Sequence, residues 1–319
     1  MRVLVTGGAG FIGSHFCERL IQKTHQVVCL DNFNDYYDPE IKRRNVASLR
    51  DHSHFDLIEG DILDTALLDK LGGSAAFDIV VHLAARAGVR PSIQQPLLYQ
   101  RVNVEGTTNL LEFCVRNHIP KIVIASSSSV YGGNEKVPFS EKDPVDHPIS
   151  PYAATKRACE LMAYTYYALH GLSATCLRFF TVYGPRQRPD MAIHKFTRLI
   201  HDGKPVPVFG DGSSRRDYTY ISDIIQGVEQ SVERCEGYHI YNLGESKTIR
   251  LKDLIPLIED ALGKKAILDP RPDQPGDVPA TYADIRRAEA DLDYRPSVPV
   301  KEGVPRFVRW YLRRIGKAG

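Results

Sequence analysis

Short apolar runs alternate with longer amphipathic runs through the first half of the chain. The apolar runs are RVLVT, QVVCL, FDLIEGD, FDIVVHLAA, KIVIASS and SATCLRFF. Their length and their content of Val, Ile, Leu and Phe are typical of strands that are buried on both faces. Between them, amphipathic stretches predict helices over 11–23, 64–71, 96–117 and 151–170. This alternation predicts an α/β fold with a doubly wound parallel sheet, in which ligands bind along the carboxyl edge of the strands.

The pattern changes after about residue 180. Pro, Gly and Arg are frequent in TVYGPRQRPDM, KPVPVFGDGSSRRDYTY and LDPRPDQPGDVP, which predicts irregular loops. Helices are expected near 221–235, 251–262 and 301–313, and a short strand at YHIYNLG. We therefore expect two domains. Residues 1–180 plus about 216–246 would form the sheet domain, and about 181–215 plus 247–319 would form a smaller mixed α/β C-terminal lobe that closes over the sheet edge.

Composition and charge narrow the possible functions. The 319 residues include 41 Lys and Arg against 39 Asp and Glu, and this net charge of +2 does not favour a nucleic-acid partner. No apolar stretch reaches the roughly 18 residues of a membrane span, and no signal-peptide pattern opens the sequence, so we expect a cytoplasmic protein. The six cysteines lack CxxC spacing and the 11 histidines lack HxxxH spacing, so we expect buried free thiols and no metal site.

A glycine-rich turn between the first strand and the first helix predicts a dinucleotide site. In VTGGAGFIG, Gly7, Gly10 and Gly13 fit GxxGxxG, and Gly8, Gly10 and Gly13 fit GxGxxG. Either spacing allows the backbone to approach a pyrophosphate at a helix N-terminus. Asp31 ends the second strand, about 20 residues further on, where a carboxylate can accept hydrogen bonds from an adenosine ribose. The motif and the acid together predict a Rossmann-type domain. No arginine follows Asp31 immediately, which favours NAD over NADP.

A tyrosine and a lysine four residues apart are the main candidates for catalysis. Tyr152 and Lys156, in SPYAATKRACE, fall on one face of an expected helix, one turn apart. A tyrosine hydroxyl is a poor base, but an ammonium a few ångström away favours the phenolate and makes it usable at neutral pH. By itself such a pair is more often a surface feature of a helix. The serines that end the strand KIVIASSSS add hydroxyl groups at the ligand-binding edge of the sheet, and this favours the catalytic interpretation.

Several motifs together resemble the short-chain dehydrogenase/reductase superfamily: GxxGxxG, the pair Gly60–Asp61, HLAA at 82–85, and YxxxK. The resemblance implies that Asp61 lies near adenine and that Lys156 holds the nicotinamide ribose. It also implies that Tyr152 takes the proton of the substrate hydroxyl while Ser127 hydrogen-bonds the same oxygen. The residues expected to bind NAD are Gly7, Gly10, Phe11, Ile12, Gly13, Asp31, Asn32, Asp61, Ile62, Ala84, Ala85, Tyr152 and Lys156.

Nearly the whole chain resembles the extended branch of this superfamily, which acts on nucleotide sugars. The similar segments are RFFTVYGPRQRPDM, VFGDGSSRRDYTYISDI and GDVPATYADI. The resemblance implies that the first domain binds NAD and the second the nucleotide sugar. It also implies that Arg216, in the RDY triplet, binds the nucleotide diphosphate, and that Asp277 meets the nucleotide ribose. Some relatives carry arginine immediately before PGD, where this chain has Gln274, so Arg271 becomes the candidate for that charge.

The serine run distinguishes three reactions that share this scaffold. By the same resemblance, sugar-nucleotide 4,6-dehydratases follow a catalytic threonine with an Asp–Glu pair, and decarboxylases that make UDP-xylose carry a glutamate just before VYG. Ser128 and Ser129 occupy these positions here and are candidates for substrate contacts. Without that carboxylate, hydride transfer alone remains. We therefore expect 4-epimerisation of a UDP-sugar: oxidation at C4, rotation of the 4-keto intermediate and reduction of its other face, with tightly bound NAD unchanged overall.

Other segments resemble the UDP-glucuronate 4-epimerases. These are LDNFNDYYDPEIKRRN, ARAGVRPSIQQP and TVYGPRQRPDMA, and Thr181 replaces the asparagine that is usual in galactose-type epimerases. Guanidinium groups suit a C6 carboxylate, so we expect Arg188 and Thr181 to bind it, with Arg186 as the second candidate. Arg86, in the RAGVR loop, is expected to close over the sugar. The resemblance thus implies conversion of UDP-glucuronate to UDP-galacturonate.

The sequence leaves other functions and the assembly open. Epimerisation of UDP-glucose and UDP-galactose is the nearest alternative. A UDP-glucuronate decarboxylase, a 4,6-dehydratase and a non-catalytic NAD-binding protein are more distant ones. The resemblance also implies a homodimer. The stretches 96–117 and 151–170 are rich in apolar and small residues and would form a four-helix seam between subunits, although the same pattern fits packing against the sheet.

Overall fold

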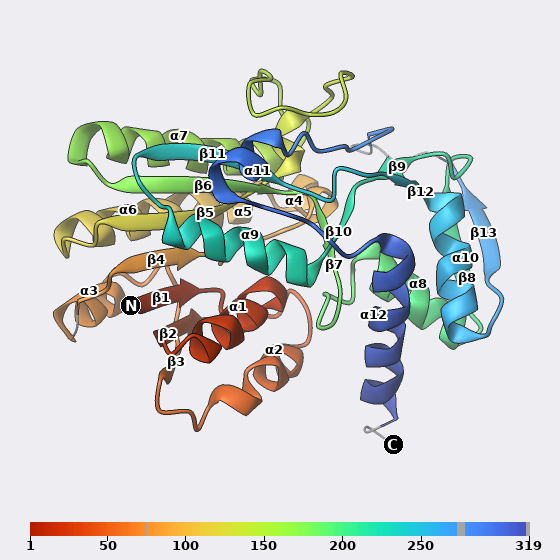
Figure 1. Ribbon diagram of the computed structural model, residues 1–319, viewed down its shortest axis with the longest axis horizontal. Coiled ribbons are helices and arrows are strands. Elements are labelled where there is room, and N and C mark those ends of the chain that lie inside the picture. The colour runs from red at the N-terminus through yellow and green to blue at the C-terminus, as the bar shows by residue number, and fades with distance from the viewer. Residues whose placement is uncertain (75, 273–277, 317–319) are drawn as a thin grey trace.

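A seven-stranded parallel sheet forms the centre of the molecule (Figure 1). The computed structural model describes residues 1–74, 76–272 and 278–316. The strand order is β11-β6-β5-β4-β1-β2-β3, and each neighbouring pair is parallel. This doubly wound arrangement confirms the predicted Rossmann-type fold. The strands are β1 (Arg2–Thr6), β2 (Gln26–Asp31), β3 (Phe55–Glu59), β4 (Ile79–His82), β5 (Lys121–Ser127), β6 (Ser173–Phe179) and β11 (Tyr238–Leu243).

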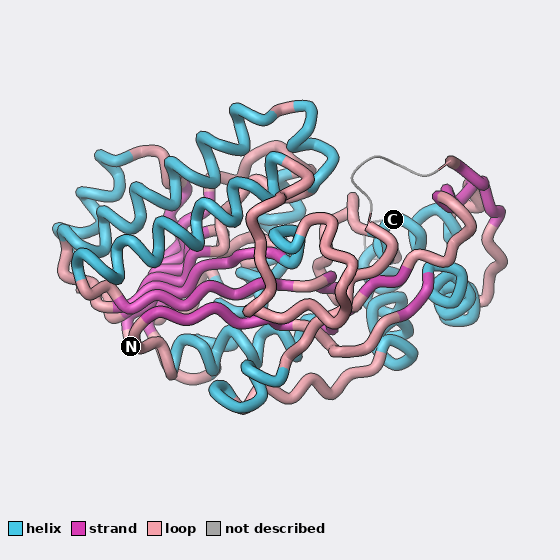
Figure 2. The backbone as a smooth tube through the Cα atoms, turned by 90° about the horizontal axis from the view of Figure 1, so that it is seen from above, coloured by secondary structure: helices cyan, strands magenta, loops and turns pink. Residues whose placement is uncertain are grey.

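Helices cover both faces of this sheet (Figures 1 and 2). One face packs against α3 (Thr65–Ser74), α6 (Gly106–Arg116) and α7 (Pro151–His170), and the other against α1 (Phe11–Gln22) and α9 (Ile221–Glu233). Successive strand residues enter different cores, because side chains alternate across a strand. On β1, Leu4 belongs to the core under α3, α6 and α7, while Val3 and Val5 belong to the core under α1 and α9. Both cores are apolar, which explains why the strands read as unbroken apolar runs.

The helix that carries the YxxxK motif has well-defined ends. α7 covers residues 151–170, as its amphipathic pattern predicts. Ser150 caps its start by accepting a hydrogen bond from the Ala153 amide (3.1 Å), and Pro151 occupies the first turn. Gly171 ends it in a left-handed conformation, with φ of 69°. These caps place Tyr152 and Lys156 in the first turns of the helix, at the end that lies next to the carboxyl edge of the sheet.

The stretch 96–117 is helical, but it is not one regular α-helix. α5 (Pro96–Tyr99) continues into π-helical turns over Gln100–Glu105 and then into α6. The side-chain amide of Asn103, within the π turns, donates to the Arg86 carbonyl (3.0 Å) and to Thr155 Oγ1 (3.0 Å). One residue therefore joins this helix to α7 and to the loop after β4. The helical period of the sequence could not reveal the wider turn, because the partners of Asn103 are distant in the chain.

A smaller mixed α/β lobe lies beside the carboxyl edge of the sheet (Figure 1). It contains the parallel pair β8 (Pro205–Phe209) and β13 (Ile267–Arg271), and three helices that pack together. The helices are α8 (Ala192–His201), α10 (Leu251–Leu262) and α12 (Val300–Ile315). Two short strand pairs lie between this lobe and the sheet: β7 (Thr181–Tyr183) with β10 (Tyr218–Tyr220), and β9 (Arg215–Arg216) with β12 (Ile249–Arg250). Short helices complete the described chain: α2 (Pro39–Asn45), α4 (Val89–Gln94), α11 (Arg286–Leu292), and 3-10 turns over Ala47–Leu49 and Ser128–Tyr131.

The chain crosses between the two parts more than once. α9 packs on α1, and β11 pairs with β6 at the edge of the sheet. α11 then packs on α9 and β11, so residues 286–292 lie against the sheet, whereas the sequence pattern assigned all of 247–319 to the smaller lobe. The pattern could not show this return, because a seven-residue helix carries too little periodicity to indicate its partner.

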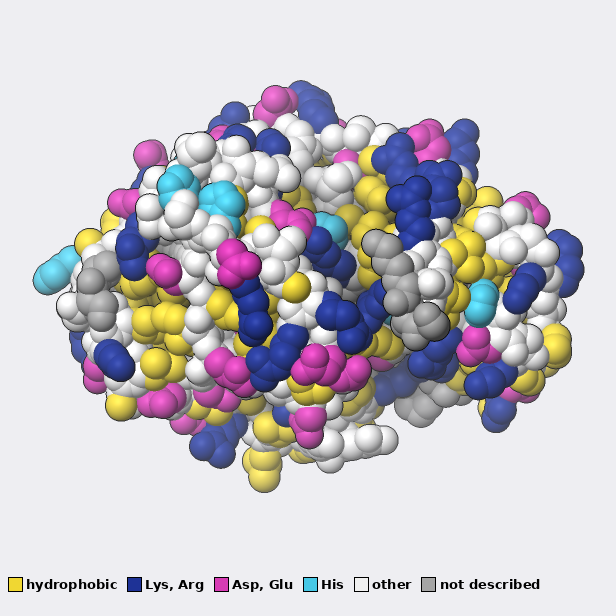
Figure 3. Space-filling view, turned by 90° about the horizontal axis from the view of Figure 1, so that it is seen from below, with side chains coloured by type: hydrophobic (Ala, Val, Ile, Leu, Met, Phe, Trp, Pro, Cys, Tyr) yellow, Lys and Arg dark blue, Asp and Glu magenta, His cyan; other side chains and the backbone are white. Residues whose placement is uncertain are grey.

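Among the described residues, no helix has both the length and the apolar character that a membrane crossing requires. No group of three or more His, Cys, Asp or Glu side chains in this part of the chain could hold a metal ion, and the six cysteines are buried free thiols. On the face seen in Figure 3, Lys and Arg are interspersed with Asp and Glu, so that face does not present a field of a single sign.

A buried histidine makes the stability of the fold sensitive to acid. His82, at the end of β4, lies between Thr6 Oγ1 (2.8 Å) and Thr107 Oγ1 (3.0 Å). Burial, together with the positive charge of Lys156, lowers its pKa from 6.5 to about 3. The unfolded chain therefore takes up a proton at a higher pH than the folded chain does. The stabilisation from neutral His82 is complete above pH 6.5 and is lost as the pH falls toward about 3, by up to about 1.4 kcal/mol per pH unit.

We expect His82→Gln to reduce this acid sensitivity, because glutamine can hydrogen-bond both threonines but does not titrate. The measurement is the free energy of unfolding by urea for both proteins, between about pH 7 and about pH 4. The variant should lose less free energy over this range than the wild type does. The partly buried His15 and the buried His194, whose pKa values desolvation lowers to about 4, are present in both proteins, so their contributions cancel. Equal losses in the two proteins would contradict the assignment to His82.

Candidate active site

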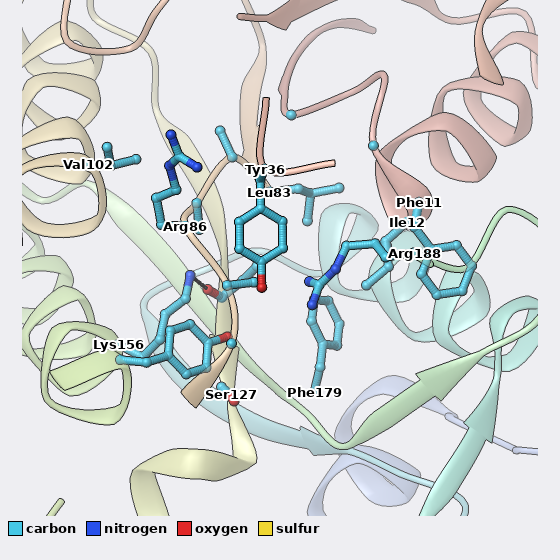
Figure 4. A pocket seen from close by; sticks show the side chains of 18 of the residues that line it. Phe11, Ile12, Tyr36, Leu83, Arg86, Val102, Ser127, Lys156, Phe179 and Arg188 are labelled. Carbon is cyan, nitrogen blue, oxygen red and sulfur yellow. Dashed lines mark hydrogen bonds between the residues drawn. The ribbon is translucent and has the colours of Figure 1, made fainter. Parts of the chain in front are cut away.

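A cavity of about 920 Å³ runs along the carboxyl edge of the sheet (Figure 4). Parallel strands all end at this edge, so the loops that follow them meet there. Most of the residues that the sequence analysis selected line the cavity. These are Gly7, Gly10, Phe11, Ile12, Gly13, Asp31, Asn32, Asp61, Ile62, Ala84, Ala85, Arg86, Ser127, Ser128, Ser129, Tyr152, Lys156, Thr181, Arg188 and Arg216.

The glycine turn after β1 is packed too tightly for side chains. At Gly7, which has φ of 69°, an added Cβ would lie 2.6 Å from the Ala84 nitrogen. At Gly13 it would lie 2.3 Å from the Gly7 carbonyl oxygen. Both contacts are with backbone atoms, which cannot move aside without a change in the turn. The turn brings the N-terminus of α1 to the cavity wall, where its free N–H groups and helix dipole favour an anion.

Asp31 ends β2 at the same part of the cavity. It is buried, and its two carboxylate oxygens accept hydrogen bonds from the backbone nitrogens of Ala9 (3.1 Å) and Phe33 (2.9 Å). The Lys42 ammonium lies 3.7 Å from the carboxylate. Burial lowers the pKa of Lys42, and the charge of Asp31 acts in the opposite direction. The carboxylate is thus held in one orientation, with lone pairs left for a further donor.

Ser127, Tyr152 and Lys156 line the middle of the cavity, where Figure 4 shows Lys156 and Ser127. Lys156 is buried and its ammonium donates to the Ala125 carbonyl (2.7 Å). Ser127 Oγ accepts hydrogen bonds from the Ser129 amide (3.2 Å) and from Ser129 Oγ (2.9 Å). Since a hydroxyl group has one hydrogen to donate, Ser127 keeps that hydrogen for a ligand.

Arg188 faces these groups from the loop after β7 (Figure 4). Its Nε and Nη2 donate to the two oxygens of Asp190 (3.0 and 2.8 Å), and its guanidinium lies 5.3 Å from the centre of the Tyr36 ring. Burial acts against the charge, but the hydrogen bonds to Asp190 raise the pKa of Arg188 above its usual value. Because a guanidinium has five N–H donors and Asp190 takes two, others remain for a ligand.

Arg186, in the same loop, points elsewhere. It has a left-handed φ of 67°, and its guanidinium pairs with Glu18 and reaches Ser14 Oγ (3.3 Å), both on α1. It is not among the described residues that line the cavity. Buried Gln187 holds the loop by donating to the Val182 carbonyl (3.0 Å). Of the two arginines considered for a carboxylate, the structure therefore brings only Arg188 to the catalytic candidates.

The residues expected to bind the nucleotide part of the substrate are Arg216, Arg271 and Asp277, and they differ in where they lie. Arg216 lines the cavity, and one of its guanidinium nitrogens donates to the Arg215 carbonyl (2.9 Å). Arg271 lies on β13, pairs with Asp269 (2.7 Å), and is not among the described residues that line the cavity. Asp277 and Gln274 lie outside the residues that the structure describes. Of the two arginines considered for the nucleotide diphosphate, Arg216 and Arg271, the structure thus brings Arg216 to the cavity.

The acidic side chains of the cavity gather at one end. Those among its described lining residues are Asp31, Asp61 and Asp64, all from the segments that end or follow β2 and β3. Ser128 and Ser129, beside the catalytic candidates, supply hydroxyl groups only. The described lining of this part of the cavity therefore provides proton transfer and hydrogen bonds, but no carboxylate for elimination or protonation at carbon.

Four residues with clear roles in the geometry were not selected from the sequence. Lys42 pairs with Asp31, Asn103 joins two helices and a loop, and Asp190 and Tyr36 hold Arg188 in place. Tyr36 and Lys42 lie within LDNFNDYYDPEIKRRN, which had drawn attention only as a whole segment. Asp190 lies in the segment TVYGPRQRPDMA, two residues after its partner Arg188. No local pattern distinguishes Asn103, because its partners lie on α7 and on the loop after β4.

Comparisons with known proteins agree with this geometry. The model of the NAD dependent epimerase/dehydratase family matches residues 3–244. UDP-glucuronate 4-epimerase 4 of Arabidopsis thaliana is 46% identical over 331 aligned positions, which cover 97% of this chain and 75% of the plant protein. The probable UDP-glucuronate 4-epimerase of Rhizobium meliloti is 40% identical, with 100% of this chain and 99% of that protein covered.

A solved structure extends the likeness to the fold. The crystal structure of UDP-glucuronic acid 4-epimerase from Bacillus cereus, in complex with UDP-glucuronic acid and NAD, matches with a TM-score of 0.92 and 36% identity. The match covers 98% of this chain and 100% of the Bacillus chain. The chain therefore belongs to the NAD dependent epimerase/dehydratase family, as its resemblance to the extended short-chain dehydrogenases/reductases predicted.

Proposed function

We propose that this protein is an NAD-dependent UDP-sugar 4-epimerase that converts UDP-glucuronate to UDP-galacturonate. One observation carries the proposal: Arg188, a guanidinium suited to a C6 carboxylate, lines the same cavity as Ser127, Tyr152 and Lys156. The hydroxyl groups of the serine run, in place of acids, support epimerisation over elimination. Relatives that bear the name UDP-glucuronate 4-epimerase, up to 46% identical to this chain, support the choice of sugar.

The part of the cavity next to the glycine turn after β1 fits NAD. The turn at Gly7 and Gly13 is closed to side chains and open to a pyrophosphate at the α1 N-terminus. We assign Asp31 to the adenosine ribose and, from the resemblance, Lys156 to the nicotinamide ribose. The remaining contacts are assigned to Gly10, Phe11, Ile12, Asn32, Asp61, Ile62, Ala84, Ala85 and Tyr152. When bound, NAD supplies a reversible acceptor for the hydrogen on C4 of the sugar.

The residues of the chain hold the sugar and move the hydroxyl proton. Tyr152 accepts the proton of the C4 hydroxyl during oxidation and returns it during reduction. Ser127 donates its remaining hydrogen to the same oxygen. Lys156, whose ammonium is held by its hydrogen bond to the Ala125 carbonyl (2.7 Å), lines the same cavity as these two groups. The proton and two electrons removed from C4 in the first half return to it in the second, so the sum of the reaction is a change of configuration.

The 4-keto intermediate can lose the carboxylate of the sugar as CO₂, because a 4-keto uronic acid is a β-keto acid. Arg188, held by Asp190 and stacked near Tyr36, offers several fixed donors to the carboxylate, which disfavours that loss and limits how far the intermediate rotates. Thr181, the first residue of β7, adds a hydroxyl to the lining of the cavity. The firm hold on Arg188 therefore adds to the serine run a second feature that favours an epimerase over a decarboxylase.

The other lining residues are assigned by their place in the cavity. Ser128, Ser129 and Arg86 are proposed to contact the sugar, and Arg216 the diphosphate. The domain that binds NAD then comprises residues 1–180 plus about 216–246, together with α11. The remaining described residues form the part that closes over the nucleotide sugar.

The enzyme should convert UDP-glucuronate to UDP-galacturonate in an assay that separates the nucleotide products by chromatography. UDP-glucose is assayed as a second substrate under the same conditions. The variant Arg188→Ala should lower kcat/KM for UDP-glucuronate by about 10- to 100-fold, which is the range expected for the loss of hydrogen bonds to a charged group. Arg186→Ala is the matched control, because it removes an arginine of the same loop that faces α1. Tyr152→Phe should reduce turnover by about 10²- to 10⁴-fold.

Each other outcome of this assay has a definite meaning. If Arg188→Ala leaves both the rate and the product ratio unchanged, the carboxylate role is wrong. Faster turnover of UDP-glucose would identify a neutral sugar as the substrate. UDP-xylose or a 4-keto-6-deoxy sugar would identify a decarboxylase or a dehydratase. A Tyr152→Phe protein as active as the wild type would favour the alternative that the protein binds NAD without catalysing a reaction.

We expect Gly13→Ala to weaken NAD binding, because its Cβ would meet the Gly7 carbonyl oxygen at 2.3 Å and displace the turn. The measurement is the NAD content of the purified protein and the dissociation constant for added NAD. Gly73→Ala, in an exposed turn of α3 with open space around the added Cβ, is the matched control and should bind NAD as the wild type does. Normal NAD content in Gly13→Ala would rule out this turn as the pyrophosphate site.

We also propose a homodimer, located in the cytoplasm. α7 exposes large apolar side chains, with Leu161 51%, Tyr164 53% and Leu169 72% exposed. An exposed apolar stripe of this kind on a long helix fits a seam in which α6 and α7 pack against their symmetry mates. Six buried free thiols are consistent with a reducing compartment.

Charged side chains in this stripe should separate the subunits. We expect the double variant Leu161→Glu, Tyr164→Glu to sediment as a monomer, while the wild type and Leu268→Glu sediment as dimers. Leu268 is the control because it is an apolar side chain of similar exposure, 56%, on β13 of the smaller lobe. Identical sedimentation of all three proteins would exclude α7 as the interface.

A further inference from the structure

A buried ion pair lies next to the catalytic candidates but does not line the cavity. Glu160 on α7 and Arg178 on β6 are 0% and 1% exposed. The Arg178 guanidinium donates to both carboxylate oxygens, from Nε to Oε1 and from Nη2 to Oε2, each at 2.8 Å. Removing two charges from water costs free energy that apolar side chains of the same volume would not cost. The pair is therefore a poor choice for stability alone, and its location indicates another role.

On one side the pair reaches the strand that carries the catalytic serine. Glu160 follows Tyr152 and Lys156 at four-residue intervals, so the three side chains share one face of α7. Ser126 Oγ, one residue before that serine, donates to Glu160 Oε1 (2.6 Å). Lys156 donates to the carbonyl of the preceding residue, Ala125 (2.7 Å). Two successive residues at the end of β5 are thus tied to two successive turns of α7.

On the other side the pair reaches the turn that follows the catalytic serine. Arg178 Nη1 donates to Tyr131 Oη (3.0 Å), and the guanidinium lies 4.9 Å from the centre of the Tyr131 ring. Tyr131 closes the 3-10 turn Ser128–Tyr131 and donates to Asn242 Oδ1 on β11 (2.7 Å). The serine run is therefore held before Ser127 through Glu160 and after it through Arg178.

We propose that Glu160 and Arg178 are positioning residues that set the place of Ser127 relative to Tyr152 and Lys156. A bidentate contact between a carboxylate and a guanidinium fixes direction as well as distance, which apolar packing does not. The pair connects α7, β5, β6 and the 3-10 turn, and two of these elements, α7 and β5, carry Ser127, Tyr152 and Lys156. The inference rests on the proposed function, since it concerns the geometry of that same reaction.

The test replaces both members of the pair together. Arg157, which also donates to Glu160 Oε2 (3.1 Å), has a side chain that is 25% exposed, so it can turn to water when the carboxylate is removed. Glu160→Leu combined with Arg178→Met removes both charges. Ser126→Ala is a milder variant that removes the bond from β5 to Glu160; because Ser126 also lines the cavity, its effect on kcat is interpreted together with its crystal structure. Glu229→Gln is the matched control. Glu229 is also buried, at 6% exposed, and it accepts hydrogen bonds from Arg19 at 3.0 Å, but it joins α1 to α9 and is not among the described residues of the cavity lining.

The first measurement is kcat and KM for the UDP-sugar on NAD-loaded enzyme, below the unfolding temperature of every variant. We expect kcat to fall about 100-fold in the double variant and about 10-fold in Ser126→Ala, because small displacements of catalytic groups have effects of this size. KM and NAD content should stay within about threefold, and the control should keep its kcat. A purely structural role would instead lower the unfolding temperature and leave the kcat of the folded protein unchanged.

The second measurement is the crystal structure of each variant with NAD, which does not depend on the substrate. The proposal requires Ser127 Oγ to move relative to Tyr152 and Lys156. It is overturned by unchanged positions, by a double variant whose kcat stays within about threefold of the wild type, or by a loss confined to KM. If the double variant does not fold, an unchanged kcat and structure in Ser126→Ala overturn it. A wild type that epimerises no UDP-sugar refutes the proposed function instead, and the crystal structures still decide the positioning role.

Discussion

The parallel register of the central sheet is the constraint on which the rest of the structure depends. Each crossover helix returns the chain to the same side, so every strand of the sheet ends at one edge. Residues far apart in the sequence, such as Gly7, Asp31, Ser127 and Arg188, meet there because they follow or end different strands. The apolar cores on both faces of the sheet hold this register, since a shift of one residue would move the side chains of a strand into the wrong core.

Charged side chains of both signs line the cavity, and they come from different strands. The acidic side chains of the described lining end or follow β2 and β3, and Lys42 lies beside one of them, Asp31. The cations Arg188 and Arg216 come from the loop after β7 and from β9, and they are the residues that we propose for the sugar carboxylate and the diphosphate. One edge of the sheet thus gathers acceptors and donors from segments far apart in the sequence.

Buried polar groups set the finer geometry of this edge. His82 is held neutral between two threonines, Asn103 links a helix to α7, and Glu160 with Arg178 links α7 to two strands. Each such group costs free energy to bury unless its partners are in place. The folded state therefore admits few alternatives around the active site, because a displaced element would leave one of these groups without a partner.

The sequence by itself determined the features that depend on local spacing. These are the alternating pattern of the sheet, the glycine turn, the span of α7, and the pair Tyr152 and Lys156 on one helix face. Only the tertiary structure decided between Arg186 and Arg188, which lie two residues apart in one loop. The left-handed conformation of Arg186 and its partners on α1 turn it away, while Asp190 and Tyr36 hold Arg188 toward the cavity. The placement of α11, the π turn at Asn103 and the Glu160–Arg178 pair depended on tertiary contacts in the same way. Their partners lie on segments that only folding brings together, so no local pattern could encode them.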